Sequence, residues 1–143
     1  MGISFSYYLG VLMQYVELIV MAALLQFLFF GVMTGKARVK YGVKAPATSG
    51  AEGFERMYRV QMNTLEMLVI FIPVIFIASN YWSPLLMSGL GAVFIIGRFM
   101  YWRAYVADPK TRSIGFMLSL LPSVVLIVLS LVGIVLSLVE AKV

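Results

Sequence analysis

The sequence predicts an all-α membrane protein, a bundle of four transmembrane helices in a single domain. Composition is the first reason: hydrophobic residues make up 62% of the 143 residues and charged residues 12%, against about 45–50% and about 25% in a soluble domain. The second reason is that the apolar residues lie in long blocks, which exceed the ~20 residues that cross a bilayer as a helix. We therefore expect residues 1–143 to form one membrane-embedded domain.

Four apolar blocks account for most of the chain. We expect helices over residues 8–33, 56–79, 83–106 and 114–139, because backbone polar groups in lipid must be satisfied within their own segment. Residues 34–53 contain several glycines, a proline and several charges, and this composition predicts the one long loop.

Basic residues gather around the connections that precede the second and the fourth predicted helix. Ten of the eleven Lys and Arg residues lie there, and only Lys142 lies at the other end. The positive-inside rule then predicts that these connections face the cytoplasm and that both termini lie on the opposite side. A basic face beside lipid indicates anionic head groups as partners and not nucleic acid. We expect a multi-pass protein of a bacterial inner membrane or of the endoplasmic reticulum.

Polar side chains form a stripe along the start of the second predicted helix. Its members fall within about 80° of one another at 100° per residue, and they are Arg56, Arg59, Asn63 and Glu66. Intramembrane charges are expensive and need a reason. Arginine donates, glutamate accepts and asparagine does both, so the stripe suits a zwitterionic ligand with carboxylates and an ammonium group. The structural alternative is an ion pair between Arg59 and Glu66 that joins helices.

The third predicted helix carries a similar face near the same end. Arg98, Tyr101 and Tyr105 follow one another at spacings of three and four residues, which places them on one side of a helix. The tyrosines also suit the aromatic belt at the membrane surface. That belt does not explain why Arg98 shares their face.

Arg112 is expected at the start of the fourth helix, where Thr111 or Ser113 can act as the cap. The free backbone N–H groups and the positive end of the helix dipole favour an anion at this place. The alternative is an arginine that reaches out to lipid phosphates. We assign no function to Glu17, which lies well inside the first predicted helix.

Two segments together resemble a known family. Residues 55–66 read ERMYRVQMNTLE and residues 98–113 read RFMYWRAYVADPKTRS. They closely resemble the signature of the MAPEG family, the membrane-associated proteins in eicosanoid and glutathione metabolism, and in particular its microsomal glutathione transferases. The resemblance covers nearly the whole chain. It implies a homotrimer with a glutathione site between adjacent subunits that opens to the cytoplasmic side.

The resemblance also implies roles for individual residues. By motif position the glutathione-binding residues are Arg38, Arg59, Gln61, Asn63, Glu66, Tyr101 and Tyr105. Gln61 points about 140° away from Arg56 on the same helix, which suits the site of a neighbouring subunit. Arg112 matches the arginine that stabilises the glutathione thiolate, and is the predicted catalytic residue. Met67 stands where leukotriene-C synthase has a glutathione-contacting tyrosine, which argues against leukotriene synthesis.

The chain contains neither cysteine nor histidine, so it supplies no thiolate and lacks the commonest base and metal ligand. A bound thiol would provide the missing nucleophile, and a nearby arginine lowers the pKa of a thiol. We expect glutathione as co-substrate, no metal, and lipophilic electrophiles or lipid hydroperoxides from the bilayer as second substrates. The alternatives are a non-catalytic lipid-binding scaffold, similar to the lipoxygenase-activating protein, and a small transporter or channel subunit.

Overall fold

The computed structural model describes residues 5–142, and their side chains from residue 10 onward. It contains four long helices, α1 (Phe5–Tyr41), α2 (Glu52–Ser79), α3 (Pro84–Ala107) and α4 (Ser113–Glu140), and one 3₁₀ turn, η1 (Pro109–Thr111). All four helices are long and apolar enough to cross a membrane. The predicted all-α bundle of four transmembrane helices is therefore confirmed.

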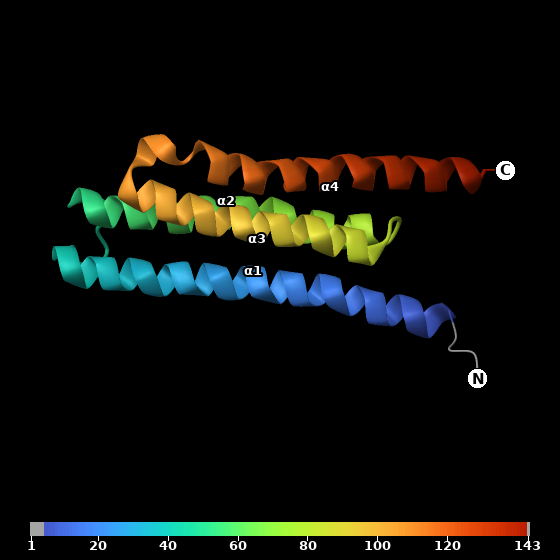
Figure 1. Ribbon diagram of the computed structural model, residues 1–143, viewed down its shortest axis with the longest axis horizontal. Helices are drawn as coiled ribbons and strands as arrows, with labels where there is room; N and C mark the ends of the chain where they lie inside the picture. Colours follow the sequence, from blue (N-terminus) through green and yellow to red (C-terminus); the bar gives the residue numbers. More distant parts are fainter. Residues whose placement is uncertain (1–4, 143) are drawn as a thin grey trace.

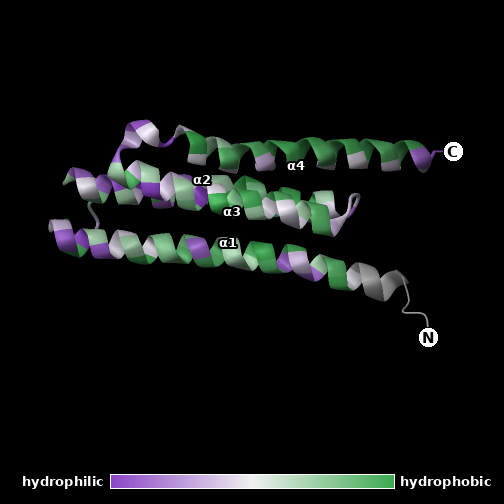
Figure 2. Cartoon of the chain, in the orientation of Figure 1, coloured by the Kyte–Doolittle hydropathy of each residue, from purple (hydrophilic) through white to green (hydrophobic). Residues whose placement is uncertain are grey.

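The helices lie side by side, with α2 and α3 between α1 and α4 (Figure 1). The connection from α1 to α2 and the η1 turn are at one end of the bundle, and both ends of the described chain are at the other (Figure 1). Figure 2 shows hydrophilic residues gathered toward the end that carries η1 and the start of α2. The basic connections and the termini therefore lie at opposite ends of the bundle, as predicted. We call the end with the α1–α2 connection and η1 the basic end.

The first helix is longer than the sequence predicts. Residues 34–41 were expected in the loop, but α1 continues to Tyr41 and carries Arg38 and Lys40 in its last turn. Basic side chains at that end interact favourably with the negative end of the helix dipole. The helix stops before Gly42, whose φ of 67° is a conformation that favours glycine. Arg38 therefore lies on a helix and not in a loop.

The core of the bundle is apolar. Phe71 of α2 and Phe94 of α3 stack with ring centroids 4.0 Å apart, and Val16 of α1 and Leu126 of α4 are completely buried in the same cluster. Many large apolar side chains remain exposed on the outside of the helices, as expected for surfaces that face lipid or another subunit.

Two glycines let α3 and α4 approach each other closely. A Cβ on Gly97 would lie 2.7 Å from backbone atoms of Leu118 and Ser119, and a Cβ on Gly115 would overlap the backbone of Tyr101. Small residues at such positions permit backbone contact between membrane helices. The consequence for the site is that the start of α4 lies directly beside Tyr101.

Candidate functional site

A polar cavity of about 460 Å³ lies at the basic end, between α2, α3 and the start of α4. Side chains from three segments far apart in the sequence meet in it. Its lining consists of Arg59, Asn63, Tyr101, Tyr105, Arg112, Ser113, Phe116 and Met117. Five of the eight predicted site residues are thus brought together within a single chain.

A buried arginine orients the asparagine of this cavity. Arg98 is completely buried, and its Nη1 donates to Oδ1 of Asn63 at 3.0 Å while its Nη2 donates to Oγ1 of Thr64 at 2.8 Å. The same guanidinium lies over the ring of Tyr101, 4.3 Å from its centroid. Because Oδ1 of Asn63 is occupied by Arg98, its amide nitrogen points the other way and donates to Oε2 of Glu66 at 3.2 Å.

The expected structural explanation for the stripe is not observed. Within residues 5–142 the one ion pair joins Arg56 to Glu52, and Arg59 and Glu66 do not pair. Both Arg59 and Glu66 are exposed on the surface of the single chain. Two opposite charges on one membrane helix are therefore available to a ligand or to another subunit.

Arg56 leaves the stripe and has a structural position. Its Nη1 donates to the carbonyl oxygens of Val106 at 3.2 Å and Ala107 at 3.0 Å. These carbonyls belong to the last turn of α3, where helix carbonyls lack intrahelical partners. Arg56 thus joins the beginning of α2 to the end of α3.

Arg112 is at the N-terminus of α4, as predicted, but the predicted cap is wrong. No side chain caps α4, because the Thr111 hydroxyl donates to the carbonyl of Asp108 at 2.8 Å. Arg112 itself donates to the carbonyl of Pro109 at 2.8 Å. Its guanidinium carbon lies 5.7 Å from the ring centroid of Tyr105, so the charge borders the cavity.

Of the three predicted residues that do not line the cavity, Glu66 is its neighbour, because it accepts from Asn63. The other two, Arg38 and Gln61, lie farther away. Arg38 donates to the carbonyl of Ala47 at 2.6 Å and stacks on the ring of Phe54, 4.6 Å from its centroid. The amide nitrogen of Gln61 lies against α1, at 3.4 Å from the place that a Cβ on Gly31 would take. Within one chain neither side chain reaches the site.

Sequence reasoning missed the partners of the site. It noticed that Arg98 shares the face of Tyr101, yet assigned Arg98 no role, and it did not single out Thr64. A buried arginine needs hydrogen-bond acceptors. This rule could have directed attention to polar side chains of the neighbouring helix as its partners. Which acceptors it finds depends on how α2 packs against α3.

Four apolar helices define a multi-pass integral membrane protein, and the cavity at one end is its candidate site. The profile of the MAPEG family matches residues 16–132, and the chain therefore belongs to the MAPEG family. This membership confirms the resemblance found in the sequence.

Several relatives are similar over most of the chain. Human microsomal glutathione S-transferase 2 is 41% identical over 92 residues, which are 64% of this chain and 63% of the relative. The bovine protein of the same name is 41% identical over 106 residues, 74% of this chain and 73% of the relative. An uncharacterized protein of Synechocystis is 42% identical over 117 residues, 82% of this chain and 85% of the relative.

Proposed function

We propose that the protein is a membrane-bound glutathione transferase that conjugates the thiolate of glutathione to lipophilic electrophiles. The observation that carries the proposal is the cavity of about 460 Å³ in which two arginines, two tyrosines and an asparagine meet at the end of an apolar bundle. Two relatives at 41% identity bear the name microsomal glutathione S-transferase 2, which supports the choice of ligand.

Glutathione carries two carboxylates, one ammonium group and a thiol. The cavity and the adjacent Glu66, which accepts from Asn63, offer partners for one carboxylate and for the ammonium group. Arg59 suits a carboxylate, since a guanidinium binds one through two parallel hydrogen bonds. Glu66 suits the ammonium group, and the hydroxyls of Tyr101 and Tyr105 suit the remaining polar atoms. Arg98 does not line the cavity and acts through Asn63, because its hydrogen bond orients the Asn63 amide toward Glu66.

The role proposed for Arg112 is to stabilise the thiolate. A positive charge beside a thiol lowers the pKa of that thiol, and the thiolate is the nucleophile. In conjugation the sulfur forms a bond to the electrophilic carbon, and the leaving group departs with its electron pair. In hydroperoxide reduction, which we propose as a second activity, two glutathione molecules are oxidised to the disulfide while the hydroperoxide yields an alcohol and water.

We further propose a homotrimer with the basic end in the cytoplasm. Glu66 and Glu17 are exposed on membrane-spanning helices of the single chain, and a carboxylate in lipid costs at least ~2.5–3.5 kcal/mol near the bilayer centre. A neighbouring subunit would cover such groups. It would also give Arg38 and Gln61, which lie outside their own cavity, a place in the next subunit's site.

Calorimetric titration of the detergent-purified protein with glutathione, followed by a conjugation assay with an apolar aryl halide, tests the function. Binding together with turnover is expected. Binding without turnover would indicate a scaffold similar to the lipoxygenase-activating protein, and absence of binding would favour a transporter or channel subunit. Native mass spectrometry in mild detergent should show three subunits, and an active monomer would refute the shared site.

A further inference from the structure

A second cavity, of about 560 Å³, lies at the basic end between α1, α2 and α3. None of the residues that line it borders the cavity proposed for glutathione. The lining consists of Met33, Lys36, Ala37, Lys40, Tyr41, Gly53, Met57, Trp102, Arg103, Val106 and Ala107. We refer to it below as the α1–α3 groove.

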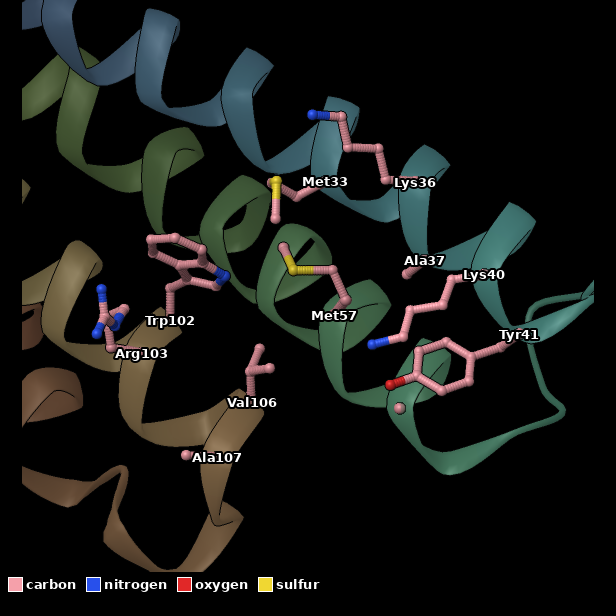
Figure 3. A pocket seen from close by; sticks show the side chains of 11 residues that line it. Met33, Lys36, Ala37, Lys40, Tyr41, Met57, Trp102, Arg103, Val106 and Ala107 are labelled. Carbon is pink, nitrogen blue, oxygen red and sulfur yellow. The ribbon is translucent and has the colours of Figure 1, made fainter.

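The α1–α3 groove combines an apolar floor with a basic rim. Figure 3 shows Met33, Met57 and Trp102 between α1 and α3. Lys40 extends from α1, and Arg103 lies on α3 at the opposite side of the groove. Lys36, Lys40 and Arg103 are all exposed. A groove of this kind is complementary to a molecule with a long apolar part and an anionic head.

Aromatic rings border two of the three cations, Lys40 and Arg103. The amine of Lys40 lies 5.1 Å from the ring centroid of Tyr41, and the guanidinium carbon of Arg103 lies 6.0 Å from the ring of Trp102. Gly53 makes room for this arrangement, because a Cβ there would overlap the ring of Tyr41. Tyrosine and tryptophan are enriched where the apolar core meets the head groups of a bilayer, which is consistent with a rim at head-group depth.

Among the side chains of residues 10–142, no acidic group forms an ion pair with Lys36, Lys40 or Arg103. No acidic residue lines the groove. Of the six acidic residues, Glu52 pairs with Arg56, Glu55 accepts from the Gly50 amide, Glu66 accepts from Asn63, and Asp108 accepts from the Lys110 amide. The remaining two, Glu17 and Glu140, belong to the halves of α1 and α4 that lead to the termini.

We propose that the α1–α3 groove binds one anionic phospholipid from the leaflet on the basic side. Its phosphate lies between Lys36, Lys40 and Arg103, and one acyl chain follows Met33 and Met57 toward the bilayer. A soluble phosphate would leave the apolar floor uncovered. Within the chain, α2 and α3 separate this groove from the proposed glutathione site. The lipid joins α1 to α3, and the proposal does not depend on transferase activity.

The two tryptophans of the chain permit a direct test. Trp102 lines the groove, whereas Trp82 donates to the carbonyl of Leu129 near the other end of the bundle. A Trp82→Phe background leaves Trp102 as the one reporter. It is reconstituted in phosphatidylcholine nanodiscs that contain a small, fixed fraction of acyl-brominated phosphatidylglycerol or of acyl-brominated phosphatidylcholine, and quenching of Trp102 is compared.

The mole fraction of brominated lipid that half-quenches Trp102 should be at least about fivefold lower for phosphatidylglycerol than for phosphatidylcholine. A fivefold preference corresponds to ~1 kcal/mol, the contribution of one cation near an anionic membrane surface. The preference should vanish in Lys36→Gln/Lys40→Gln/Arg103→Gln and fall in Lys40→Gln/Arg103→Gln. The matched control for the double variant, Lys44→Gln/Lys110→Gln, removes the same charge from the basic end but outside the groove and should keep the preference.

Three results would overturn the proposal. Equal quenching by both lipids would mean that the groove has no head-group preference. Equal loss in the two double variants would mean that bulk surface charge attracts the lipid. Protection of Trp102 from both quenchers would mean that another protein surface, such as a second copy of the chain, covers the groove.

Discussion

Replacement of Asn63 by Ala tests the connection between the buried arginine and the candidate glutathione site. Asn63 is the acceptor for Nη1 of Arg98 at 3.0 Å and the donor to Glu66 at 3.2 Å. Arg98 is completely buried, so water cannot readily replace the lost acceptor. A hydrogen bond to a charged group is worth about 1.5–3 kcal/mol, and we expect Asn63→Ala to lower the free energy of unfolding by about that amount.

Asn63→Asp separates stability from binding. An aspartate keeps an acceptor oxygen for Arg98, so the free energy of unfolding should stay close to that of the wild type. It cannot donate to Glu66, and its charge repels that carboxylate. Glutathione affinity should therefore fall by about tenfold or more, which at ~1.4 kcal/mol per decade corresponds to one lost hydrogen bond.

Unfolding by SDS in mixed micelles, followed by circular dichroism, measures the first quantity, and calorimetric titration with glutathione measures the second. If Asn63→Ala unfolds at the same SDS fraction as the wild type, the hydrogen bond between Arg98 and Asn63 does not contribute to stability. If Asn63→Asp binds glutathione as the wild type does, the orientation of Asn63 toward Glu66 has no role in the site.

Three further changes test other parts of the structure. Arg112→Ala should keep most glutathione affinity but raise the pKa of the bound thiol, so that turnover near neutral pH falls at least tenfold and recovers in part as pH rises; ultraviolet difference spectra of the thiolate measure this shift. Arg59→Ala should weaken glutathione binding by about 1.5–3 kcal/mol, the contribution of a hydrogen bond to a charged group, which titration calorimetry detects. Gly115→Ala should destabilise the bundle by about 1–3 kcal/mol, because the added methyl group overlaps the backbone of Tyr101, and SDS unfolding measures the loss.

Two of these changes have a matched control variant. Arg112→Lys keeps the charge without the planar fork and should rescue turnover only in part; thiolate formation by Arg112→Ala at wild-type levels would exclude thiol activation by this residue. For Arg59, unchanged affinity in the Ala variant would exclude this residue from glutathione binding. Gly89 has no atom within 4 Å of an added Cβ, so Gly89→Ala should leave stability unchanged or raise it, and an equal loss in both glycine variants would contradict the close approach at Gly115.

The class of protein, the four spans and the polar stripe were predictable from the sequence because each depends on local physics. The length of an apolar block is set by the thickness of the bilayer, and the face on which Arg59, Asn63 and Glu66 lie follows from the period of one helix. The alternation of basic and neutral connections likewise places ten of the eleven basic residues at the same end. The extension of α1 to Tyr41 was missed, since glycines and charges between apolar blocks are equally typical of a loop.

The partners of these residues were decided by tertiary structure. The sequence offered Arg56, Arg59 and Arg98 as similar arginines on helices, yet one binds the end of α3, one is exposed at the cavity, and one is completely buried between Asn63 and Thr64. Helical periodicity determines the direction of a side chain around its own axis only. Its partner depends on the rotation and separation of the neighbouring helices, and these are set by contacts such as Gly97 against Leu118 and Ser119, which join positions distant in the sequence.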